Sequence, residues 1–159
     1  MRIFFISTEW ILILSVVLWF TFQHVAEYLA HKIPNQWLSP NAFLFKERRW
    51  EKGGAFYSKV FKVKKWKRFL PDGAAARKNG YRKKNLTDFS TENLELFLVE
   101  SCRAELMHLL AIIPFWIFGL FAPAEIIIYM FIYALAVNLP CIIVQRFNRP
   151  RIKKLIERR

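Results

Sequence analysis

Apolar residues concentrate in three segments of the chain, and polar or charged residues separate these segments. The segments cover residues 3–25, 104–121 and 124–144. Each is close to the roughly 20 residues that a helix needs to cross the apolar core of a bilayer. The pattern therefore predicts an all-α integral membrane protein with about three transmembrane helices in a single membrane-embedded domain, residues 1–159.

Local signals add detail to the second and third segments. Ser90 stands in the N-cap position of the second helix, with Glu92 in its first turn, where an acid favours the helix dipole. Pro114 is expected to kink this helix, which membrane helices tolerate. The short link 121–125 contains no Lys or Arg and predicts a helical hairpin.

The N-terminal segment has features of a secretory signal peptide, because Met1-Arg2 precedes an apolar run. However, Glu9 lies near the start of the run, and no small-residue cleavage site follows it. We interpret this segment as a retained membrane helix.

The positive charge is as uneven as the hydrophobicity. The chain carries a net charge of +13, with 15 Lys and Arg against four acids in residues 46–91 and seven against Glu157 in residues 146–159. Both basic segments adjoin apolar ones, so topology and attraction to anionic lipid explain them better than nucleic-acid binding, which is not expected. The positive-inside rule places both in the cytoplasm and the N-terminus outside, in the cell membrane.

The segment 46–91 also contains bulky aromatic residues among its bases, such as Trp50 and Trp66. Disordered basic tails lack such residues. We expect an interfacial segment at headgroup level, with aromatic rings toward the lipid and lysines toward phosphates.

No Gly-rich phosphate loop, zinc-finger spacing or nucleophile elbow is present, and no cofactor is expected. Four polar residues instead gather at the mouth of the second span, in two pairs spaced i,i+3: Glu100 with Arg103, and Glu105 with His108. A carboxylate beside an imidazole suits a general base. The alternative is an ion-pair network without chemistry. A metal site is not expected, because Glu-x-x-His supplies two ligands where three or four are needed.

A second polar cluster closes the third span and contains Asn138, Gln145, Arg146, Asn148 and Arg149. The hairpin would bring both clusters to the cytoplasmic interface. Arg146 and Arg149 are suited to clamp a phosphate, because guanidinium is a fork-shaped donor. Topology alone explains such arginines but explains Gln145 and Asn148 poorly.

Five motifs follow one another between residue 32 and the C-terminus: Lys32-Ile33-Pro34; Glu51-Lys52-Gly53-Gly54 with Phe56-Tyr57-x-Lys59; Val63-Lys64-Lys65-Trp66-Lys67 before Asp72-Gly73; Glu100-x-x-Arg103-Ala104-Glu105-Leu106-x-His108; and Asn138-x-Pro140 with Val144-Gln145-Arg146-Phe147-Asn148-Arg149-Pro150-Arg151. With them the chain resembles the glycosyl-4,4′-diaponeurosporenoate acyltransferases. The resemblance implies transfer of a fatty acyl chain to the glucose 6-hydroxyl of a membrane-bound glycosyl carotenoid ester, the last step of staphyloxanthin-type biosynthesis.

We hypothesise an acyl transfer without a covalent intermediate. His108, backed by Glu105, removes the sugar hydroxyl proton, and Asp72 is a weaker alternative base. The pair of Glu100 and Arg103 holds the helix end. Binding of the substrates is assigned to the remaining polar residues: Lys65, Lys67, Asn138, Gln145, Arg146, Asn148 and Arg149.

Two other functions stay open at this point. The chain could be a non-enzymatic scaffold that binds anionic lipid, or an acyltransferase acting on another glycolipid. The expected partners of the enzyme are membrane lipid, the glycosyl carotenoid acceptor, a fatty acyl donor with an unidentified carrier, and other enzymes of the pathway.

Overall fold

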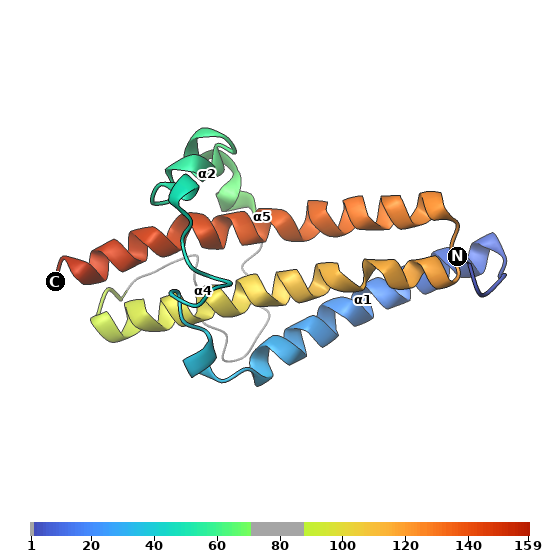
Figure 1. The fold of residues 1–159 in the computed structure, drawn as a ribbon, viewed down its shortest axis with the longest axis horizontal. Coiled ribbons are helices and arrows are strands. Elements are labelled where there is room, and N and C mark those ends of the chain that lie inside the picture. The colour runs from blue at the N-terminus through green and yellow to red at the C-terminus, as the bar shows by residue number, and fades with distance from the viewer. Residues whose placement is uncertain (1, 71–87) are drawn as a thin grey trace. The chain divides into compact units, whose positions relative to one another are not determined.

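The computed structural model describes residues 2–70 and 88–159, and every regular element in this part of the chain is helical. The three long helices are α1 (Thr8–Lys32), α4 (Thr91–Ile112) and α5 (Ala124–Glu157) (Figure 1). The shorter elements are η1 (Asn35–Trp37), η2 (Arg49–Glu51), α2 (Ala55–Lys59), α3 (Val63–Trp66), η3 (Lys67–Phe69) and η5 (Ile113–Leu120). For the described residues, the predicted all-α class is confirmed.

The chain divides into two compact units. Unit 1 consists of Met1–Lys32 and Leu106–Ile142, and unit 2 consists of Ile33–Glu105 and Ile143–Arg159. Both α4 and α5 therefore contribute residues to each unit. The single domain expected from the sequence stays a prediction.

Unit 1 is held together mainly by apolar packing. Trp19 of α1, Phe118 of η5 and Ala134 of α5 belong to one buried cluster. Its aromatic rings meet edge to face, as in the pair of Phe22 and Phe118 at 5.9 Å between ring centroids. Arg2 links the N-terminal residues to Phe121, because its Nε donates to the carbonyl oxygen of Phe121 at 2.9 Å.

The first helix is displaced from the apolar segment 3–25 that predicted it. Backbone N–H groups of Ile3 and Phe4 donate to Leu120 O instead of starting a helix, and α1 begins at Thr8. The helix then runs to Lys32, beyond the apolar segment. It ends there because Ile33 precedes Pro34, and the residue before a proline is disfavoured in helical conformation.

The second helix begins as the local signals predicted, whereas the kink expected at Pro114 stays a prediction. Ser90 Oγ accepts from the N–H of Asn93 at 3.4 Å, which is the N-cap geometry. Pro114 has no N–H to donate, and α4 passes at Ile112 into the 3₁₀ helix η5. The third helix extends beyond the apolar segment 124–144. It continues as α5 through Pro140 and Pro150 to Glu157.

Two helices, α1 and α5, are long and apolar enough to cross a membrane. Only 22% of the most apolar window of each is buried, whereas the core helix of a soluble protein would be mostly buried. Side chains such as Phe20 and Ile132 are more than half exposed. Lipid favours such a surface, and these helices therefore indicate a membrane protein. The third span, at 104–121, stays a prediction.

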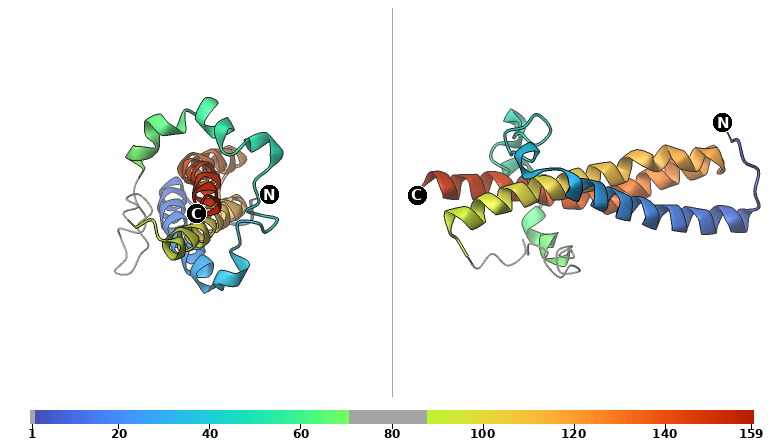
Figure 2. Two further views of the ribbon diagram at one scale, coloured as in Figure 1. Left: turned by 90° about the vertical axis from the view of Figure 1, so that its left-hand side faces the viewer. Right: turned by 90° about the horizontal axis from the view of Figure 1, so that it is seen from below.

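In unit 2, residues 33–70 arc around the C-terminal part of α5 (Figure 2). Tyr57 and Val63 pack there against Ile143 and Phe147. The loop before α2 approaches α5 closely at Gly54, which has a φ of 79°. A Cβ at this position would lie 2.9 Å from Phe147 O, so the motif requires glycine at this position.

Candidate active site

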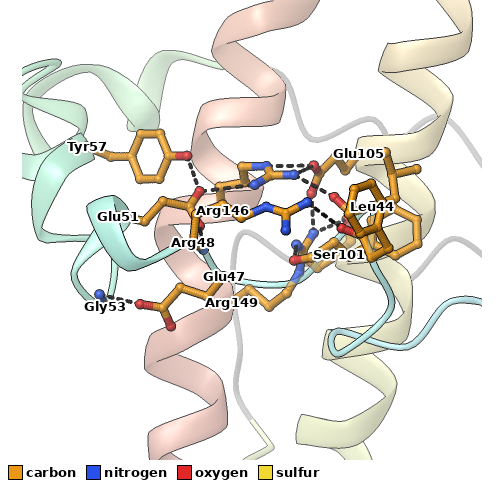
Figure 3. Close-up of polar contacts among 12 residues, drawn as sticks. Leu44, Glu47, Arg48, Glu51, Gly53, Tyr57, Ser101, Glu105, Arg146 and Arg149 are labelled. Carbon is orange, nitrogen blue, oxygen red and sulfur yellow. Dashed lines mark hydrogen bonds and ion pairs between the residues drawn. The ribbon is translucent and has the colours of Figure 1, made fainter.

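Unit 2 contains a buried chain of alternating charges (Figure 3). Glu105 of α4 has no exposed surface and accepts from Arg146 Nε at 2.7 Å and from Arg149 Nη2 at 2.6 Å. Glu51 of η2 is 2% exposed and accepts from Arg146 Nη1 at 3.1 Å. Burying these ions is costly, and the alternation of sign with additional hydrogen bonds offsets that cost. The network thereby joins η2, α4 and α5.

The guanidinium groups also hold the backbone of the segment before η2. Arg146 Nη2 donates to Leu44 O at 2.7 Å, and Arg149 Nη1 donates to Phe45 O at 2.9 Å. Glu51 accepts from the N–H of Arg48 at 2.5 Å. An irregular segment has few backbone partners of its own, so these charged side chains set its path.

Tyr57 completes the network, because its hydroxyl donates to Glu51. Burial raises the pKa of the Tyr57 hydroxyl, and the hydrogen bond to the Glu51 carboxylate raises it further. The hydroxyl therefore stays protonated over the physiological range and acts as a donor.

Lys67 and Asn148, both predicted to bind substrate, lie together in unit 2. Lys67 Nζ is 3.4 Å from Asn148 Oδ1 and 5.1 Å from the centre of the Phe147 ring. Burial lowers the pKa of Lys67, and the nearby charges of Arg151 and Lys64 lower it further. An anion that approaches Lys67 would offset the repulsion from Arg151 and Lys64 and so stabilise the charged form of Lys67.

Unit 1 contains a polar pair that joins α4 to α5. His108 Nδ1 lies 2.8 Å from Asn138 Oδ1, and the fully buried Asn138 donates from Nδ2 to Ala134 O at 2.9 Å. The bond to Ala134 assigns the amide orientation, so Asn138 presents an oxygen to the ring. Nδ1 must then carry the proton. In the neutral ring, Nε2 keeps its lone pair and can act as a base.

The two predicted i,i+3 pairs differ in outcome. The pair of Glu100 and Arg103 is present, at 3.0 Å between Oε1 and Nε, and Arg103 also donates to Ile33 O and Asn35. Glu105 and His108 instead have different partners. The arginines of α5 offer Glu105 charge-assisted bonds that a neutral imidazole cannot match. The ring is oriented by Asn138, which had been predicted to bind substrate.

The remaining predicted site residues are placed as follows. Lys65 is exposed on α3. Gln145 is partly buried, and its Oε1 has no hydrogen-bond partner among the described residues. Asp72 lies outside the described residues.

Comparison with known proteins decides the family. The family model of glycosyl-4,4′-diaponeurosporenoate acyltransferase matches residues 40–158. The chain belongs to this family. The glycosyl-4,4′-diaponeurosporenoate acyltransferase of Staphylococcus aureus strain USA300 is 36% identical over 138 residues, covering 87% of this chain and 83% of the relative. That of strain bovine RF122 / ET3-1 is 35% identical over the same length. No solved structure matches the chain.

Membership of this acyltransferase family favours the enzyme over the non-enzymatic scaffold. The structure also brings into the network two residues that sequence reasoning had not placed in the site, Glu51 and Tyr57. Both lie in residues 40–158, which the family model matches, and Glu51 is one of four acids in the basic segment 46–91. An acid surrounded by so many bases was the feature of the sequence from which a buried ion pair at Glu51 could have been predicted.

Proposed function

We propose that this chain is a membrane acyltransferase that transfers a fatty acyl chain to the glucose 6-hydroxyl of a glycosylated carotenoid ester. The proposal is supported by the family membership, since the relatives are named as glycosyl-4,4′-diaponeurosporenoate acyltransferases. The exposed apolar faces of α1 and α5 support it. A carotenoid acceptor and a fatty acyl tail would both dissolve in lipid, with the sugar at headgroup depth.

We further propose three membrane spans in one domain, with the N-terminus outside and the basic segments 46–91 and 146–159 in the cytoplasm. The support is the distribution of charge: the two segments carry net charges of +11 and +6, and the link 121–125 has no Lys or Arg. Lys and Arg in short loops are retained on the cytoplasmic side.

In the proposed reaction, Nε2 of His108 accepts the proton of the sugar hydroxyl as its oxygen attacks the acyl carbonyl carbon. A new carbon–oxygen bond forms, the bond from the acyl carbon to its carrier breaks, and the proton passes to the leaving carrier. Asn138 is a positioning residue in this scheme. Its oxygen holds the Nδ1–H and so keeps the lone pair on Nε2.

The other site residues keep supporting roles in the proposal. Glu105 holds Arg146 and Arg149, while Glu100 and Arg103 hold the beginning of η1. Binding of the donor or of anionic lipid is assigned to Lys65, Lys67, Gln145 and Asn148, together with the two arginines. Asp72 stays the alternative base.

The base is tested in membranes from cells that supply the glycosylated carotenoid, with the acylated product measured by mass spectrometry. General-base catalysis contributes roughly 10²–10⁴-fold, so His108→Ala should lower product formation at least about 100-fold. His24→Ala is the matched control, because His24 Nδ1 lies 2.8 Å from Phe20 O of its own helix and contacts no other described site residue. Full activity in His108→Ala would show that another residue acts as the base. If the unaltered chain forms no acylated product, the glycosylated carotenoid ester is not the acceptor.

The positioning role of Asn138 is tested by separating kcat from KM. Asn138→Ala removes the acceptor for Nδ1–H and should lower kcat about tenfold or more with KM nearly unchanged. Asn138→Asp keeps an acceptor oxygen and should recover part of the loss. Equal losses in the two variants would indicate a purely structural role.

A further inference from the structure

Unit 2 contains a cavity of about 330 Å³ between the segment before η2 and the C-terminal part of α5. Six of its twelve lining residues are Lys or Arg, and two are Glu. This excess of positive charge favours the binding of an anion. The cations are Lys46, Arg48, Arg49, Arg146, Arg149 and Lys153.

The two acids of the cavity are already engaged by the protein. Glu51 accepts from Arg146, Arg48 and Tyr57, and Glu47 accepts from the N–H of Gly53 at 2.5 Å. The exposed cations are not neutralised in this way. In the described part of the chain, Lys46 and Arg49 have no ion-pair partner, and Lys153 Nζ contacts the uncharged Asn41 Oδ1 at 3.1 Å.

A second observation comes from the wall of the cavity. Arg149 is 5% exposed, and its Nε has no acceptor among the described residues. Burying a charged donor without an acceptor is costly. An anionic oxygen bound in the cavity, with a small shift of the guanidinium, would supply the missing acceptor.

The size and lining indicate which part of a substrate fits. About 330 Å³ is at the lower end for small-molecule sites, and eight of the twelve lining residues carry a charge. Because six of these charges are positive, the cavity suits a compact anionic group. The acceptor of the proposed function is a sugar ester and carries no charge, so of the two substrates only the donor can bring the anion.

We infer that this cavity binds a phosphate of the acyl donor, and that the donor is a thioester of phosphopantetheine, the group found in coenzyme A. This inference rests on the proposed acyl transfer. In the reaction, the sugar oxygen forms a bond to the acyl carbon and the carbon–sulfur bond breaks. The hydroxyl proton ends on the departing thiolate, so no further reactant is needed.

The test measures binding of coenzyme A without an acyl chain to the full chain in detergent by calorimetry. Arg49→Gln and Lys153→Gln each remove one charge from the cavity. Each should weaken binding about tenfold, as expected for the loss of one charge-assisted bond. Lys64→Gln and Arg158→Gln are the matched controls, because both residues are exposed and lie outside the cavity lining.

Further probes separate the sources of phosphate. Pantetheine, which lacks phosphate, should bind weakly and with equal affinity to all variants. Phosphatidylglycerol vesicles should bind cavity and control variants alike. Vesicle binding that is lost selectively in the cavity variants would assign the cavity to lipid headgroups and overturn the donor assignment.

The outcome is independent of the acyl-transfer test. If His108→Ala abolishes product formation while Arg49→Gln and Lys153→Gln leave both coenzyme A binding and the KM for the donor unchanged, the cavity inference is refuted and the proposed function stands. If coenzyme A binding depends on the cavity but no acylated carotenoid forms, the proposed acceptor is refuted.

Discussion

The two units of this protein share apolar packing but differ in the charge that they bury. In unit 1, aromatic and aliphatic side chains such as Trp19 and Phe118 form the buried cluster, and the pair of His108 and Asn138 adds polar contacts. In unit 2, the buried charges of Glu51, Glu105 and Arg149 determine how its segments meet. The comparison shows where substitutions should matter most: in unit 2 through uncompensated charge, and in unit 1 through lost packing.

The largest effect on stability is expected for Glu105→Gln. This change leaves two arginine charges without their shared carboxylate, and breaking a buried ion pair costs about 3–5 kcal/mol. Thermal unfolding in detergent and hydrogen exchange of residues 33–70 measure it. Glu95→Gln, exposed on the same helix, is the control. Equal stability of the two variants would show that the network does not hold unit 2 together.

A smaller effect is expected in unit 1 for Phe118→Ala, although Phe118 is fully buried. Lipid is as apolar as a protein core, so the loss is mainly one of packing contacts and amounts to about 2 kcal/mol. Phe20→Ala is the control, because Phe20 is 62% exposed on α1. Hydrogen exchange should increase in unit 1 and stay unchanged in residues 33–70. Increased exchange in both units would contradict the separation of the two packing modes.

The smallest effect is expected for Tyr57→Phe and depends on pH. Burial raises the pKa of Tyr57 in the folded protein above its ordinary value of 10.0. The stabilisation by the protonated hydroxyl is therefore complete below pH 10 and is lost as pH rises further, because the unfolded chain then releases the proton first. At neutral pH the variant should lose about 1 kcal/mol.

Unfolding free energies measured between pH 7 and pH 11.5 check this prediction. The difference between the unaltered chain and Tyr57→Phe should shrink above pH 10. A difference that is constant with pH would mean that the hydroxyl of Tyr57 does not titrate with folding.

Much of the fold could be predicted from local signals. The apolar segments predicted the long helices, and Ser90 and Pro114 marked where the second helix begins and changes. The ends of α1 and α5 were not predicted well. Hydropathy finds the part of a helix that suits lipid, whereas helical hydrogen bonding continues through polar residues, to Lys32 in α1 and to Glu157 in α5.

The residues of the candidate site stay a prediction, and the contacts among them differ in part from those expected from the sequence. His108, Glu105, Arg146 and Arg149 were all singled out, and the resemblance identified the family. The partners of Glu105 and His108 were assigned from helix spacing alone. Spacing says which residues of one helix can touch, but it says nothing of a stronger partner on another helix.

The sequence by itself determined the helical class, the apolar segments, the two basic segments and the membership of the acyltransferase family. These follow from composition, periodicity and motifs, which depend on neighbouring residues. Only the tertiary structure decided that Arg146 meets Glu51, 95 positions away in the chain, and that Asn138 rather than Glu105 orients His108. Such choices depend on which distant segments the folded chain brings within hydrogen-bond distance, and on competition between charged and neutral partners there.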